Sequence, residues 1–291
     1  MTDHDPLRCY FELPEELADI NTADAAILPV PYDQTATWKK GAARAPEAIL
    51  EASHHIESFD VVTGVEPGRW GIATLDPVDF DGPPEELADR VDERVADLIE
   101  KGILPVILGG DHSISIGAIR AAARLVPGVT VLQLDAHTDT REECWGSTHN
   151  HACTMNWARQ WCPIVQVGIR AVDGPEMPLL DQDRVFYAHQ ICGPDKSPDW
   201  IDRVVKLLTE KVYLTIDVDC FDPSIVPATG TPEPGGLDWY QVDALLEQVA
   251  KQREIVGFDV VELLPTAEQW ASDFLVAKLI YRFLGRVFSN G

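Results

Sequence analysis

The sequence is organised around Leu132-Gln133-Leu134-Asp135-Ala136-His137-Thr138-Asp139. A hydrophobic run rich in Val and Leu ends here in three potential metal ligands at alternate positions, Asp135, His137 and Asp139. Side chains two residues apart in an extended chain point to the same side. We therefore expect these three side chains to converge on one point.

A second apolar run, at residues 212 to 216, leads into Asp217 and Asp219 in the same way. Two apolar strands that each end in alternating carboxylates predict one shared metal site at the strand ends. Elsewhere, continuous apolar segments alternate with amphipathic helices, which is typical of a parallel sheet covered on both faces. We predict an α/β protein, three-layer α/β/α with a central, mostly parallel sheet, in a single domain over residues 1–291. Ligands bind at the carboxyl ends of strands in such sheets.

The predicted elements follow from apolar periodicity and from Gly and Pro punctuation. Strands are predicted at residues 24–30, 71–75, 103–108, 129–134, 164–169, 185–188, 212–217 and 255–261. Helices are predicted at residues 46–58, 84–100, 113–125 and 198–208, around the apolar stripe at 242–249, and at 270–284, where Gly285 is expected to stop the last one.

The composition of the chain limits which partners it can bind and in which compartment we expect it. A formal net charge of −25 disfavours nucleic acid and anionic membranes as partners, because both require a basic surface. This charge would attract a cationic substrate only weakly. Solubility or adaptation to a salty cytoplasm explains the charge equally well. Six cysteines without CxxC spacing argue against a disulfide framework and a cysteine zinc site. The acidic amino terminus resembles no export signal, and no apolar run approaches the ~18 residues of a membrane span, so we expect a cytoplasmic protein.

The strand predicted at 103–108 ends in Gly109-Gly110-Asp111-His112-Ser113. The two glycines permit a tight turn, after which Asp111 or Ser113 can cap the next helix. A turn and a cap do not explain His112, which a stiff turn holds at a strand end. We interpret His112 as a metal ligand.

The candidate ligands are two imidazoles and four carboxylates: His112, Asp135, His137, Asp139, Asp217 and Asp219. They are too many for one tetrahedral zinc with an open position. They suit two divalent ions ~3.5 to 4 Å apart, bridged by carboxylates and a water. Oxygen-rich ligation with two histidines favours manganese, Mn2+, two ions per subunit. Water between two such ions becomes hydroxide near neutral pH, which is a hydrolytic nucleophile.

Five blocks, in order, resemble the signature blocks of the ureohydrolases, the family of arginase, agmatinase and guanidinobutyrase. They are GGDHS at 109–113, DAHTD at 135–139, TIDVDCFDP at 215–223, TGTPEPGG at 229–236 and DVVE at 259–262. The resemblance implies an arginase/deacetylase-like fold and two manganese ions bridged by Asp135 and Asp217. One ion would also bind His112 and Asp139, and the other His137 and Asp219.

The resemblance also implies roles in the reaction. Glu262 matches the carboxylate that grips the substrate guanidinium, and Thr231 lies in the block that lines that pocket. Asp139 would hydrogen-bond the bridging hydroxide. His151 aligns by spacing with a proton-relaying histidine, although this chain has His-Ala where the family commonly has His-Gly. We interpret the neighbouring His149 as a solvated loop residue.

The implied reaction is hydrolysis of a small cationic guanidino compound by a metal-bridging hydroxide, first of all agmatine to putrescine and urea, a step of polyamine biosynthesis. Glu142 and Glu143 could attract the far ammonium of agmatine, whereas Arg141 could hold a carboxylate, as guanidinobutyrate requires. Guanidinopropionate and arginine are further candidates. A single-zinc deacetylase-like amidohydrolase and a non-catalytic relative are the remaining alternatives. The resemblance suggests a homo-oligomer, a trimer or hexamer.

Overall fold

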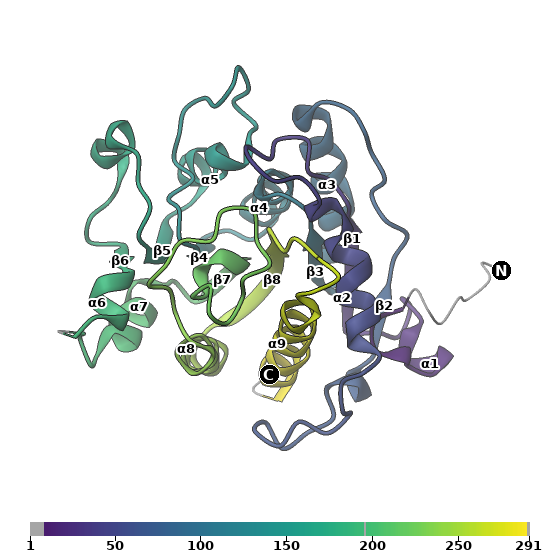
Figure 1. Cartoon of the computed structure of the whole chain (residues 1–291). Helices are drawn as coiled ribbons and strands as arrows, with labels where there is room; N and C mark the ends of the chain where they lie inside the picture. The colour runs from purple at the N-terminus through teal and green to yellow at the C-terminus, as the bar shows by residue number, and fades with distance from the viewer. Residues whose placement is uncertain (1–8, 195, 290–291) are drawn as a thin grey trace.

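The computed structural model describes residues 9–194 and 196–289 (Figure 1). Within these residues, eight strands form one sheet in the order β2-β1-β3-β8-β7-β4-β5-β6, and every neighbouring pair is parallel. The strands are β1 (Ala25–Val30), β2 (Ile72–Thr74), β3 (Leu104–Gly109), β4 (Thr130–Leu134), β5 (Ile164–Ile169), β6 (Val185–Tyr187), β7 (Lys211–Asp217) and β8 (Glu254–Val261). All eight predicted strands are present.

Helices cover both faces of the sheet, so the three-layer α/β/α prediction is confirmed (Figure 1). One face packs against α2 (Ala45–Ser53), α7 (Trp200–Leu207), α8 (Trp239–Gln252) and α9 (Trp270–Ser289). The other packs against α3 (Pro84–Glu100), α4 (Ser115–Leu125) and α5 (Thr154–Trp161). The short α1 (Glu15–Ala18) and α6 (Ala188–Cys192) complete the helices of the described residues.

Burial on both faces explains why the strands are continuously apolar. In β3, Val106 and Leu108 belong to the core under α2 and α9, while Ile107 between them belongs to the core under α3 and α4. All three side chains are fully buried. Alternation of polar and apolar residues would expose one face, and here neither face is exposed.

Two predicted helix ends are wrong. The helix expected to reach residue 58 ends at Ser53 as α2. The last helix does not stop at Gly285 but continues to Ser289. A Cβ on Gly285 would lie 2.9 Å from Cγ of Pro67, so this glycine allows α9 to approach the segment around Pro67 closely. Its small size is used for packing.

The described helices include none that is long and apolar enough to cross a bilayer. Residues 1–8, part of the stretch from which the absence of an export signal was inferred, lie outside the described residues. The assignment of residues 1–291 to a single domain stays a prediction.

Candidate metal centre and substrate pocket

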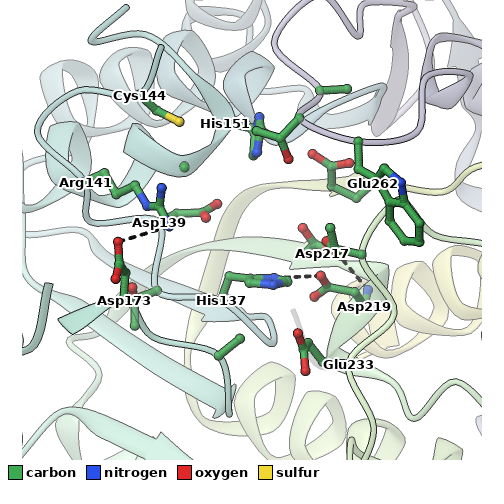
Figure 2. A pocket seen from close by; sticks show the side chains of 18 of the residues that line it. His137, Asp139, Arg141, Cys144, His151, Asp173, Asp217, Asp219, Glu233 and Glu262 are labelled. Carbon is green, nitrogen blue, oxygen red and sulfur yellow. Dashed lines mark hydrogen bonds and ion pairs between the residues drawn. The ribbon is translucent and has the colours of Figure 1, made fainter. Parts of the chain in front are cut away.

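The candidate site lies at the carboxyl ends of β3, β8, β7 and β4, which are neighbours in the centre of the sheet. Because the strands are parallel, these ends share one edge, and the side chains that follow them meet there. A cavity of about 750 Å³ opens at this edge (Figure 2). That volume is within the ~300–1,000 Å³ of ordinary small-molecule sites.

The structure brings the predicted ligands together in two overlapping groups. His112, Asp135 and Asp139 place one ligand atom each within 4.8 Å of one another, and so do Asp135, His137 and Asp219. Asp135 belongs to both groups. Asp217 lies beside the first, with its Oδ2 3.6 Å from Nδ1 of His112. Two groups with a shared carboxylate are the arrangement that a pair of bridged ions requires.

The surroundings of His112 test whether a metal fits. Its buried Nδ1 has no hydrogen-bond partner in the part of the chain that the structure describes. The same atom lies only 2.9 Å from Oδ2 of Asp139 and 3.2 Å from Oδ2 of Asp135. A ring nitrogen that faces two carboxylates without hydrogen-bond geometry is oriented to share a cation with them. The residues therefore fit divalent metal ions with nitrogen and oxygen ligands.

The site carries more negative charge than its histidines can balance. Burial raises the pKa of the Asp217 carboxyl well above its ordinary value, and the charges of Asp219 and Asp135 raise it further. Burial lowers the pKa of His137, but the charge of Asp219 and the contacts with Asp135 outweigh burial and raise it to about 12. These shifts mean that the buried carboxylates attract protons or other cations.

Two of the site residues have a left-handed backbone, Asp139 with φ of 50° and Glu262 with φ of 63°. The expectation that residues 135 to 139 stay extended is therefore wrong at Asp139, because β4 already ends at Leu134. The left-handed region costs a non-glycine residue roughly 1–2 kcal/mol and is found preferentially at functional sites. The turn at Asp139 is held by its carbonyl oxygen, which accepts hydrogen bonds from Met155 and Asn156.

A glycine is required in the turn before His112. A Cβ on Gly110 would lie 1.8 Å from the carbonyl oxygen of Tyr32, a distance that no side chain tolerates. Asp111 then caps the turn by accepting a hydrogen bond from the Ser113 amide at 3.0 Å. Oε1 of Glu262 accepts the His112 amide at 2.8 Å, which joins the ends of β3 and β8.

Sequence reasoning missed a layer of buried polar side chains beneath the ligands. Nε2 of His112 lies 2.8 Å from Oγ1 of Thr215, which donates to Asp259 at 2.5 Å, and Tyr213 donates to the same carboxylate at 2.7 Å. Gln133 likewise donates to Asp135 at 2.7 Å. The sequence contained one signal for this layer, a polar residue inside each apolar strand, because a buried polar group requires a hydrogen-bond partner.

The expected substrate-binding residues Thr231, Glu262 and His151 all line the cavity. Glu142 and Glu143 are exposed and are not among its lining residues. Asp173 and Glu233, which the sequence did not single out, line it instead (Figure 2).

Three Lys and Arg side chains line the cavity, and each makes a contact within the protein. Nη2 of Arg141 lies 3.5 Å from Oδ2 of Asp173. Arg170 donates to the carbonyl oxygens of Asp219 and Glu233, both at 2.7 Å, and the ammonium of Lys39 lies 5.1 Å from the ring centroid of Trp38.

The backbone after His151 suits alanine at position 152, where the family commonly has glycine. His151 begins a short 3-10 helix, His151–Cys153, and Ala152 is not among the residues with positive φ. His149 is a loop residue as expected, but it is half-buried: its ring packs 4.7 Å from that of Trp157, and burial lowers its pKa.

Comparison with known proteins supplies independent findings. The model of the Arginase family matches residues 23–285. The chain is 37% identical to a Synechocystis protein named N(1)-aminopropylagmatine ureohydrolase, over 93% of this chain and 92% of the relative. It is 31% identical to an agmatinase of Pyrococcus horikoshii, over 94% and 96% of the two chains. The solved agmatine ureohydrolase of Thermoplasma volcanium superimposes with a TM-score of 0.83 at 31% identity, covering 92% of this chain and 90% of that one.

Proposed function

This chain belongs to the arginase family, and on that premise we propose that its substrate is agmatine, which it hydrolyses to putrescine and urea. The chain is a ureohydrolase of the agmatinase type, a hydrolase of linear amidines, as the resemblance of its signature blocks predicted. The deacetylase-like and non-catalytic alternatives are set aside by this family membership.

The observation that carries the choice of substrate is the state of the cations in the cavity. Arginine and guanidinobutyrate bring a carboxylate, which needs a cationic partner. Arg141 is instead paired with Asp173, and Arg170 with backbone carbonyl oxygens. Glu233 adds negative charge to the lining, while the charge of Asp173 balances that of Arg141. A substrate that is cationic at both ends suits this lining better than one with a carboxylate.

We propose that the metals are two manganese ions, one held by His112, Asp135, Asp139 and Asp217 and the other by Asp135, His137, Asp217 and Asp219. When bound, they supply Lewis-acid activation of a water molecule that attacks the guanidinium carbon.

The side chains of this chain would bind the substrate and move its protons. Glu262 would receive two guanidinium donors, and burial together with the charge of Asp111 raises the pKa of its carboxyl well above the ordinary value. A cationic guanidinium beside it restores the charge balance. Asp139 would accept a proton from the attacking water, and His151 would give its Nε2 proton to the departing amine. The proton on Asp139 would then return to His151 and restore both groups. The bond between the guanidinium carbon and the alkyl nitrogen breaks, which leaves urea and putrescine.

N(1)-aminopropylagmatine is the second candidate substrate. The Synechocystis relative carries that activity in its name, and the cavity of about 750 Å³ has room for the longer chain. Glu233 supplies a carboxylate for one of its two distal amino groups.

The test is urea release by the manganese-loaded enzyme from agmatine, N(1)-aminopropylagmatine, arginine, guanidinobutyrate and guanidinopropionate. We expect kcat/KM for the carboxylated compounds to be lower than for the amines by at least about 100-fold, because their carboxylates would remain unpaired in the cavity. Glu262→Gln should remove most of the activity, whereas Glu254→Gln, at the exposed start of the same strand, should not. No urea from any compound, with two metals bound, would refute the function.

A further inference from the structure

The loop that follows β1 reaches the candidate proton relay. We propose that Thr35 on this loop is a positioning residue for His151: its hydroxyl makes Nδ1 of the imidazole an acceptor, so that Nε2 carries the ring proton towards the cavity. The inference rests on the role of His151 proposed above. Thr35 lies outside the five signature blocks, and the sequence alone does not distinguish it from its polar neighbours.

Thr35 is 7% exposed and makes three polar contacts with the His151 loop, through its hydroxyl and its carbonyl oxygen. Its Oγ1 accepts the backbone N–H of His151 at 3.0 Å and lies 3.1 Å from Nδ1 of the same residue. Its carbonyl oxygen accepts from Nδ2 of Asn150 at 3.3 Å. The loop after β1 and the His151 loop are thereby fixed to each other.

Donation to Nδ1 is the direction of this bond that gives the hydrogen of the buried hydroxyl an acceptor. A threonine hydroxyl has one hydrogen to donate and two lone pairs that accept. The His151 amide occupies one lone pair, and Nδ1 is the other partner of Oγ1 among the described residues. If the hydroxyl donates to Nδ1, a neutral ring must carry its single proton on Nε2.

The other end of Thr35 is tied to the metal centre. Its backbone N–H donates to Oδ2 of Asp111 at 2.9 Å, while Oδ1 of Asp111 caps the turn that carries His112. On the far side, Oγ1 of Thr154 donates to the carbonyl oxygen of His112 at 3.1 Å. His151 is therefore held against the His112 turn from two directions. A fixed distance between a proton relay and the departing nitrogen is what proton transfer requires.

The test is a double-mutant cycle on urea release from agmatine by the manganese-loaded enzyme. Thr35→Val keeps the shape of the side chain but loses the hydroxyl, and we expect kcat to fall about 10- to 100-fold with KM within about twofold. Thr35→Ser should restore kcat to within about threefold. In a His151→Ala background, Thr35→Val should cause no further loss, because Thr35 acts through His151.

Each outcome decides something different. An equal loss from Thr35→Val with and without His151 would overturn the inference, since the threonine would then act on the fold or on the metals. An unchanged kcat in His151→Ala alone would instead refute the proposed role of His151. Melting temperature and metal content of each variant identify a folding defect.

A second measurement needs no variant. Neutron diffraction from crystals of the deuterated, metal-loaded enzyme locates the ring proton directly, at a pD where the ring carries one deuterium. We expect deuterium on Nε2 of His151 and the Thr35 hydroxyl pointing at Nδ1. Deuterium on Nδ1 would overturn the inference even if Thr35→Val does not fold.

Discussion

Two clusters of buried charge are built in opposite ways. The strand-end cluster places five carboxylates around two histidines at the metal centre: Asp135, Asp139, Asp217, Asp219 and Glu262 with His112 and His137. The helix cluster lies between α8, α9 and the segment around Asp60. There, Asp60 lies 3.0 Å from both Lys278 and Arg282, and Asp243 lies 2.9 Å from Arg286.

The difference lies in whether each cluster balances its own charge. In the helix cluster every buried carboxylate has a cationic side chain from α9, so the cluster needs nothing from outside and fixes the helix to its surroundings. The strand-end cluster has an excess of carboxylates that raises the pKa of Asp217 and Glu262. Such an excess persists in a folded protein when cations complete it, and we propose metal ions and a cationic substrate for that role.

Asp217→Asn should have the largest effect. It removes a proposed metal ligand, so we expect urea release to fall more than about 100-fold, beyond the 10- to 100-fold that changes around a metal's ligands cause. Metal content should fall below two per chain while circular dichroism stays that of the folded protein. Asp202→Asn, on the exposed side of α7, is the matched control. Full activity with two metals bound would show that Asp217 is no ligand.

Asp60→Asn should reduce stability and leave kcat unchanged. Removing one partner from a buried ion pair costs about 3–5 kcal/mol, because Lys278 and Arg282 lose their counter-charge. Asp97→Asn breaks an exposed pair with Lys101, and we expect it to cost at most about 0.5 kcal/mol. Urea denaturation of the three proteins measures the difference, and an Asp60→Asn enzyme as stable as the wild type would contradict the structural role.

The Asp60 effect should also depend on pH. Burial raises the pKa of Asp60, but the Thr63 amide, Lys278 and Arg282 outweigh burial and leave it below its ordinary 3.8. A lowered folded-state pKa stabilises above the unfolded value and loses that contribution as the pH falls towards the folded value. The stability gap between wild type and Asp60→Asn should therefore narrow below about pH 4.

Thr215→Val should weaken metal binding with a smaller effect on the fold. It leaves Nε2 of His112 without its partner, and loss of such a contact typically weakens metal affinity 10- to 100-fold. Thr215→Ser should bind manganese as the wild type does. Titration calorimetry with manganese gives the affinity directly, and equal affinities for the valine and wild-type proteins would exclude this role for Thr215.

Asp273→Asn should have the smallest effect, and a stabilising one. Asp273, in the first turn of α9, is 9% exposed, and burial together with the charge of Glu51 raises its pKa to about 6. Stability from a raised pKa is present below the unfolded value and is lost as the pH rises through about 6. The substitution should add about 1–2 kcal/mol at pH 7 and much less at pH 4. A pH-independent gain in thermal unfolding would contradict this explanation.

The sequence anticipated the site because the informative residues follow recognisable strands. Asp135 comes directly after an apolar run, and Asp217 ends one. The parallel architecture already implied that the carboxyl ends of such strands share one edge of the sheet. The reason given for their convergence was incomplete, since Asp139 reaches the site through a left-handed turn. The prediction that the last helix stops at Gly285 was wrong, because this glycine, a residue that commonly ends a helix, serves close packing here.

The strands, most helix boundaries and the kinds of side chain that follow each strand depend on near neighbours, so they could be predicted from the sequence. Which distant residues meet depends on the tertiary structure. Thr215 lies 103 residues from His112, and Thr35 lies 116 residues from His151. Periodicity and turn chemistry act over a few residues, whereas these contacts depend on the order of strands in the sheet. The sheet order places β3, β8, β7 and β4 side by side, and that order turns separate motifs into one site.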